Sequence, residues 1–178
     1  LNPICWIIHA TGSLIAELSR LDLPSFPKKF MISRFSSVAL ESIEKILDQT
    51  NIPSRKLAVE NVEFPFRAME DVLETLDLSI CFDTGHLIAG FSGEWENGEK
   101  EFFESYQDRI VELHLHDAFR NSGKDGHKPL GKCDLRVREL LITLLDKQFS
   151  GPIVFELTLE GVRESMNFIR LNVPEALN

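Results

Sequence analysis

Five short apolar runs recur along this chain, and each ends in a side chain that can bind a metal ion. The runs are apolar throughout instead of alternating, which predicts parallel strands that are buried on both faces. Segments with helical periodicity separate the runs. This repetition of strand and helix predicts an α/β fold with a parallel sheet. The five expected strands are residues 4–8, 57–59, 78–82, 110–115 and 153–155.

Two architectures have this alternation of strands and helices: an open, doubly wound sheet and a closed (β/α)₈ barrel. The sequence contains neither the GxGxxG nor the GxxxxGK[ST] loop of nucleotide-binding open sheets, which favours the barrel. A closed barrel needs roughly 250 residues, and this chain has 178. We therefore expect one partial barrel domain over residues 1–178, with about three N-terminal βα units missing from this chain or supplied by another. The first residue is Leu1 and not Met, as in a processed or partial chain.

The polar residues at the strand ends are His9, Glu60, Asp83, His114 and Glu156. In βα folds the C-terminal ends of parallel strands converge on one mouth. Buried carboxylates are costly without a counter-charge, and a divalent cation removes that cost. A single acidic residue after a strand is often only a helix cap or a solvated loop residue. The joint set predicts a metal site held by Glu60, Asp83, His114 and Glu156.

A second group of ligand-type residues follows closely. His86 comes three residues after Asp83, and Asp125 and His127 lie in the loop after the fourth run. Together with His9, these residues are candidates for additional metal or substrate contacts. Mixed oxygen and nitrogen ligands suit Mn²⁺ and Zn²⁺ about equally. The sequence therefore leaves open one to three ions of Mn²⁺, Zn²⁺ or Mg²⁺.

Composition limits the partners and the cellular compartment that we expect for this protein. The net charge of −9 argues against a dedicated nucleic-acid-binding protein, which needs a basic face for phosphates. No apolar run approaches the ~18 residues that span a bilayer, and the N-terminus lacks the pattern of a signal peptide. The three cysteines are widely spaced, as free thiols in a reducing compartment are. We expect a cytoplasmic protein without membrane contact.

Five motifs resemble one superfamily, the xylose isomerase-like TIM barrels, also called the AP endonuclease family 2 superfamily. The resemblance runs from about His9 to Arg170 and corresponds to strands four to eight of that barrel. This combination of motifs is specific for the superfamily, but it does not identify the reaction. Members of the superfamily include sugar and sugar-phosphate isomerases, epimerases, and endonuclease-four-type DNA repair enzymes. The motifs are ENVE (60–63), FDTGH (82–86), HLHD (114–117), DGHKPLGKCDL (125–135) and VFEL (154–157).

Similarity to the ketose-epimerase branch implies one metal on the four ligands named above. It also implies that Glu60 and Glu156 are catalytic and move a proton on opposite faces of the sugar carbon. His86 and Arg120 match the substrate-binding residues of that branch. The sequence departs from it at Phe66, where many of these epimerases have a second glutamate.

Similarity to the endonuclease-four branch implies three zinc ions in the same fold. Glu60 would bridge two ions, His9 would bind the first, and His86, Asp125 and His127 would bind the third. The substrate would be a small phosphodiester or abasic DNA, and the acidic charge favours the smaller one. The sequence departs at Cys133, where the family usually has a glycine with its wider choice of backbone conformation.

We expect an isomerase or epimerase that acts on a small sugar or sugar phosphate, with the hydrolase as the alternative. A third alternative is an inactive or binding-only barrel fragment. Open barrel edges would expose apolar parallel strands, which proteins avoid. A dimer or an element-swapped assembly is therefore expected if the chain is complete.

Overall fold

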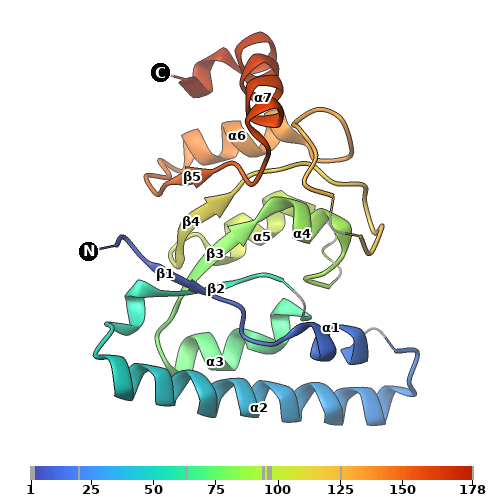
Figure 1. The fold of residues 1–178 in the computed structure, drawn as a ribbon, viewed down its shortest axis with the longest axis vertical. Coiled ribbons are helices and arrows are strands. Elements are labelled where there is room, and N and C mark those ends of the chain that lie inside the picture. The colour runs from blue at the N-terminus through green and yellow to red at the C-terminus, as the bar shows by residue number, and fades with distance from the viewer. Residues whose placement is uncertain are drawn as a thin grey trace.

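Five parallel strands form one sheet in which the spatial order equals the order along the chain (Figure 1). The computed structural model describes residues 3–19, 21–62, 64–93, 95, 98–124 and 126–177. Each strand begins and ends within two residues of a predicted apolar run, so the predicted α/β fold with a parallel sheet is confirmed. The strands are β1 (Trp6–Ile8), β2 (Leu57–Glu60), β3 (Ser79–Asp83), β4 (Ile110–His114) and β5 (Ile153–Val154).

Helices occupy every connection between neighbouring strands, as parallel pairing requires. Helices α2 and α3 lie at the β1–β2 end of the sheet, and α6 and α7 lie beyond β5 (Figure 1). None of the helices within the described residues is both long and apolar enough to cross a membrane. The α-helices are α1 (Ser13–Ser19), α2 (Ser25–Thr50), α3 (Glu70–Thr75), α4 (Thr84–Ala89), α5 (Gly98–Tyr106), α6 (Val137–Asp146) and α7 (Leu159–Asn172). Three 3₁₀ turns are η1 (Ser54–Lys56), η2 (Phe66–Met69) and η3 (Pro174–Leu177).

The core lies between the inner strands and the helices, and it is rich in phenylalanine. Every residue of β2 and β3 is buried. Phe82 of β3 stacks on Phe102 of α5 with ring centroids 4.7 Å apart, and Phe66 packs on the same ring at 5.1 Å. Successive side chains of a strand point to opposite faces. Because Phe82 points toward the helices, Asp83 points to the other face of the sheet.

The two outer strands differ from the expectation of burial on both faces. Trp6 of β1 is 37% exposed, and Ile153 and Val154 of β5 are 41% and 40% exposed. In the part of the chain that is described, the sheet ends at β1 and at β5, so no neighbouring strand shields the outer edges. Continuous apolar character therefore predicted the strands correctly, but the predicted complete burial holds only for β2 and β3.

Candidate metal centre

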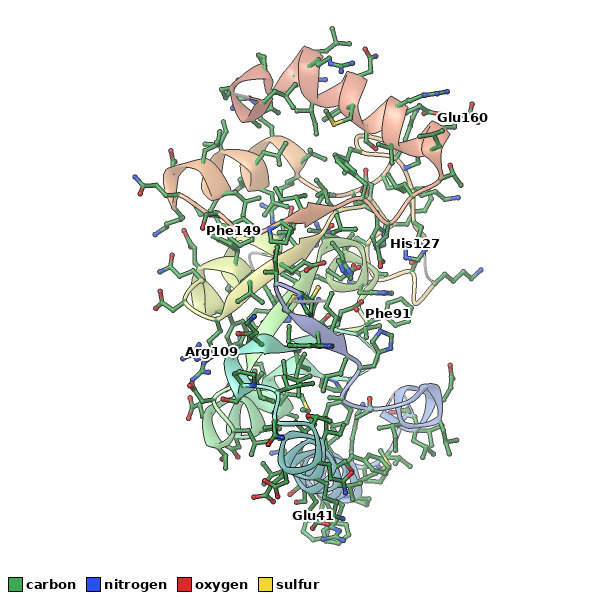
Figure 2. All side chains as sticks on the ribbon, turned by 60° about the vertical axis from the view of Figure 1, so that its left-hand side comes forward. Glu41, Phe91, Arg109, His127, Phe149 and Glu160 are labelled. Carbon is green, nitrogen blue, oxygen red and sulfur yellow. The ribbon has the colours of Figure 1, made fainter. Side chains whose placement is uncertain are left out.

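The C-terminal strand ends meet at one mouth of the sheet. In Figure 2, His127 and Phe91, which follow β4 and β3, lie on one side of the molecule. Arg109 and Phe149, which precede β4 and β5, lie on the opposite side. The register places Asp83 beside His114. The predicted ligands therefore come from strands that end at the same edge.

His114 is the centre of the predicted ligand set. Its Nδ1 atom lies 3.2 Å from Glu156 Oε1, and 3.8 Å from both Glu60 Oε2 and Asp83 Oδ2. This nitrogen is buried and has no hydrogen-bond partner among the described residues. A buried polar atom without a partner costs about 1–3 kcal/mol, and the facing carboxylates add repulsion between like charges. A divalent cation would remove both costs, so these oxygen and nitrogen donors fit one.

Asp83 is held in place by contacts on all sides. Its carboxylate accepts the backbone N–H of His86 at 2.6 Å as the N-cap of α4. Asn61 accepts the backbone N–H of Asp83 at 2.6 Å and donates to its carbonyl at 2.9 Å. Burial by itself raises the pKa of Asp83, but the hydrogen bond from His116 and the positive charge of His86 lower it overall. The residue is thus a helix cap and an ionised candidate ligand at once.

His116 lies among the candidate ligands, although no role was predicted for it from the sequence. Its buried ring places Nε2 3.1 Å from the Asp83 carboxylate. A donor atom of His116 also lies within 4.8 Å of donor atoms of His86, His127 and Glu156. The spacing of 114 and 116, which puts both side chains on one face of an extended strand, was the signal that could have revealed it.

His9 and His86 flank Glu60. His9 Nε2 lies 3.4 Å from Glu60 Oε2, and His86 Nε2 lies 3.6 Å from Glu60 Oε1. Glu60 and His86 are buried, whereas the side chain of His9 is 50% exposed. His127 reaches the other carboxylate, with its Nε2 atom 3.3 Å from Glu156 Oε2. The structure therefore brings three of the four additional candidates to the predicted ligands, and Asp125 lies outside the described residues.

Arg120 lies in the loop that follows β4. It lines a cavity of about 970 Å³ together with Arg67, Trp95 and Arg136, and none of the four predicted ligands contributes to the described lining. Its guanidinium lies 3.7 Å from the buried Glu99 and donates to the carbonyl of Asp134. The role of Arg120 in binding substrate stays a prediction.

The loop that carries His127 is organised by Asp117, a second residue for which no role was predicted from the sequence. The Asp117 carboxylate is completely buried and accepts four backbone N–H groups at 2.8–3.1 Å. Asp117 and Lys128 also exchange backbone hydrogen bonds at 2.8 and 2.9 Å. The loop is therefore tied down on both sides of His127. The four donors belong to Ala118, Lys132, Cys133 and Leu135.

Comparisons with known proteins agree with this fold. A D-tagatose 3-epimerase-like protein superposes with a TM-score of 0.63 at 19% identity, covering 86% of this chain and 60% of that one. A 3-keto-D-glucoside 4-epimerase from E. coli superposes with a TM-score of 0.57 at 15% identity, covering 85% of this chain and 59% of that one. An L-ribulose 3-epimerase superposes with a TM-score of 0.51 at 13% identity, covering 88% of this chain and 58% of that one. The chain thus spans about three fifths of the length of these proteins.

A search of proteins with curated functions gives no match. The sequence profile of one family does match, and it covers residues 33–171, which is most of the chain. This range includes the four predicted ligands and all strands except β1. The chain belongs to the xylose isomerase-like TIM barrel family.

Proposed function

We propose that this chain forms strands four to eight of a (β/α)₈ barrel that acts as a divalent-metal-dependent sugar or sugar-phosphate isomerase or epimerase. One observation carries the proposal: a buried nitrogen of His114, which has no hydrogen-bond partner among the described residues, faces three carboxylates. The family supports it, as do the names of the similar structures, which are a ketose 3-epimerase, a keto-glucoside epimerase and a D-tagatose 3-epimerase-like protein.

Glu60, Asp83, His114 and Glu156 would hold the ion. A bound divalent ion would polarise a carbonyl and so acidify the neighbouring C–H bond. Glu60 and Glu156 approach the same His114 nitrogen from different strands, which would place them on either side of a small substrate. One glutamate would take the proton from carbon and the other would return one on the opposite face. His86, beside Glu60, would donate a hydrogen bond to a substrate oxygen.

Deuterium exchange tests this proposal directly. Ketoses and ketose phosphates are incubated with the chain and Mn²⁺ in D₂O, and incorporation beside the carbonyl is followed by NMR. We expect exchange with the wild type and a loss of about 10²-fold or more in Glu156→Gln. Glu164→Gln is the matched control, because Glu164 pairs with Lys132 on the surface at 3.1 Å. Bound metal without exchange in any substrate would contradict the proposal.

A metal-dependent phosphodiester hydrolase is the second candidate. It is favoured by the cluster of His86, His116, His127 and Glu156, whose donor atoms lie within 4.8 Å of one another beside the first ligand set. Two adjacent ions can clamp the attacking and leaving oxygens of a phosphodiester. Two or three ions per chain by elemental analysis, with turnover of bis-p-nitrophenyl phosphate, would favour this function. One ion per chain would favour the isomerase.

We further propose that the outer edges of β1 and β5 pair with additional βα units. The exposed apolar side chains of Trp6, Ile153 and Val154 support this, because unpaired parallel edges are prone to association. The units could belong to the same polypeptide or to a second copy of this chain. Light scattering of the chain in solution tests whether a second copy supplies them, in which case a dimer is expected.

A further inference from the structure

The two ring nitrogens of His114 face different groups. Nδ1 faces the three carboxylates of the proposed metal site. Nε2 lies 3.5 Å from Oε1 of Glu112, a residue of the same strand. Residues 112 and 114 point to the same face of β4 because strand side chains alternate. The His114 ring therefore lies between the proposed metal site and a further carboxylate, and both side chains are largely buried, at 8% and 13% exposure.

Glu112 also contacts a residue beside β1, the strand at the far edge of the described sheet. Its second oxygen, Oε2, accepts a hydrogen bond from the Cys5 thiol at 3.2 Å. Cys5 precedes β1, so this contact links the first and fourth strands of the sheet. Burial, followed by the hydrogen bond and charge of Glu112, raises the pKa of Cys5 to about 12. The thiol therefore keeps its proton at neutral pH and remains a donor.

A neutral imidazole has one N–H donor and one acceptor nitrogen, and its neighbours decide which nitrogen is which. Nδ1 makes no hydrogen bond within the described part of the chain, whereas Nε2 lies 3.5 Å from Oε1 of Glu112. Glu112 can only accept a hydrogen bond when ionised, which favours the proton on Nε2. Metal-binding histidines commonly donate their other N–H to a carboxylate, which fixes the ring and raises its basicity.

We propose that Glu112 is a positioning residue that accepts the Nε2–H of His114 and thereby directs the Nδ1 lone pair at the metal, while Cys5 holds the second oxygen of Glu112. This inference rests on the proposed function, since it assumes that His114 binds a divalent ion. Glu112 itself does not contact substrate. Its effect is on the orientation and tautomer of a ligand.

Three variants test the role of Glu112. Glu112→Leu removes the acceptor, Glu112→Gln keeps an acceptor without charge, and Glu41→Gln is the control. Glu41 is an exposed glutamate of α2, and Figure 2 shows it at the end of the molecule away from His127. Long-range ¹H–¹⁵N correlation spectra of the metal-free protein report which His114 nitrogen carries the proton. We expect Nε2–H in the wild type and in Glu41→Gln, and a shift toward Nδ1–H in Glu112→Leu.

Titration calorimetry with Zn²⁺ or Mn²⁺ supplies a second readout. The dissociation constant should rise about 10- to 100-fold in Glu112→Leu, rise less in Glu112→Gln, and stay unchanged in Glu41→Gln. If Glu112→Leu fails to fold, Cys5→Ala and Cys5→Ser replace it. The alanine variant should then weaken metal binding, whereas serine, which keeps a donor, should restore it.

The failure of this inference differs from the failure of the proposed function. An unchanged tautomer together with an unchanged dissociation constant in Glu112→Leu would overturn the role of Glu112, even if the wild type binds metal tightly. A wild type that binds no divalent ion would overturn the proposed function, and the tautomer of the metal-free protein would still report whether Glu112 orients His114.

Discussion

The imidazole of His116 lies directly against Gly85, so that a Cβ atom at residue 85 would be only 1.9 Å from Cε1 of the ring. The same ring contacts the Asp83 carboxylate at 3.1 Å. The φ angle of Gly85 is not in the left-handed region, so this glycine is needed for space and not for backbone conformation. The glycine of the DTGH sequence thus lets His116 reach Asp83.

Gly85→Ala should destabilise the protein although residue 85 lies in a helix, where alanine is normally preferred by about 0.5–1 kcal/mol. We expect a loss of about 1–3 kcal/mol from overpacking, measured by denaturant unfolding. In the His116→Ala background the same substitution should cost little, because the ring it meets is gone. An equal loss in both backgrounds would show that the His116 ring is not the cause.

Asp117→Asn should loosen the loop that carries His127. The carboxylate accepts four backbone N–H groups, and an amide presents a donor to some of them. Hydrogen bonds to a charged group contribute about 1.5–3 kcal/mol, so we expect a loss of about 2 kcal/mol or more. Hydrogen exchange of residues 132–135 should accelerate in the variant. The control is Asp146→Asn, at the exposed C-terminal end of α6, where loss of a negative charge is neutral or mildly favourable.

The strands and the gathering of the candidate ligands at one edge of the sheet could be predicted from the sequence because both follow from local patterns. An apolar run that ends in Glu60 or Asp83 needs no knowledge of its neighbours, and the parallel fold then brings the strand ends together. The placement of His9, His86 and His127 followed the same logic. Their distances of 3.3–3.6 Å to Glu60 or Glu156 agree with it.

The contacts of Glu112 and Asn61 could not be predicted in this way, because they join residues that lie in or beside different strands. Cys5 and Glu112 are separated by 107 residues along the chain. Only the packing of the sheet, in which Cys5 precedes β1 and Glu112 lies in β4, brings their side chains to 3.2 Å. The substrate-binding role of Arg120 was implied by a family pattern and stays a prediction. The structure places its side chain beside Glu99 and Asp134.

Asp77 gives a pH-dependent prediction away from the site. The hydrogen bond from Arg55 lowers its pKa against an opposing effect of burial, and the charge of Arg55 and the contact with Arg109 lower it further. A carboxyl group with a lowered pKa stabilises the fold at pH values above its unfolded pKa of about 3.9. This stabilisation is lost as the pH falls through the pKa of the folded state. Asp77→Asn should therefore lower Tm at pH 7, and the difference from the wild type should vanish near pH 2.

Asparagine suits this test because residue 77 has a φ of 50°, which asparagine adopts readily. The effect is expected to be small, since both Arg55 and Asp77 are about half exposed. Thermal scans between pH 2 and pH 7 provide the measurement. A Tm difference that is the same at every pH would mean that the ion pairs of Asp77 are not its source.

The three free cysteines should react with thiol reagents at different rates. Burial and the Glu112 contact raise the pKa of Cys5 to about 12, which lowers its thiolate fraction about 10³-fold against an ordinary thiol. Cys81 is fully buried, and burial followed by the charge of Glu60 raises its pKa further. Cys133 lies partly exposed in the loop after β4. At pH 8 we expect labelling of Cys133 first, slow labelling of Cys5, and labelling of Cys81 only on unfolding.

Mass spectrometry of labelled peptides over time gives the three rates, and Glu112→Gln separates the causes at Cys5. Burial is the largest cause of the raised pKa, and the hydrogen bond and charge of Glu112 come after it. Glu112→Gln should therefore accelerate Cys5 only part of the way to its rate in denaturant, and Glu41→Gln should not change it. A Cys5 that already reacts at the denatured rate in the wild type would mean that its thiol does not reach Glu112. The carboxylate beside His114 would then lack the anchor on β1 that its positioning role requires.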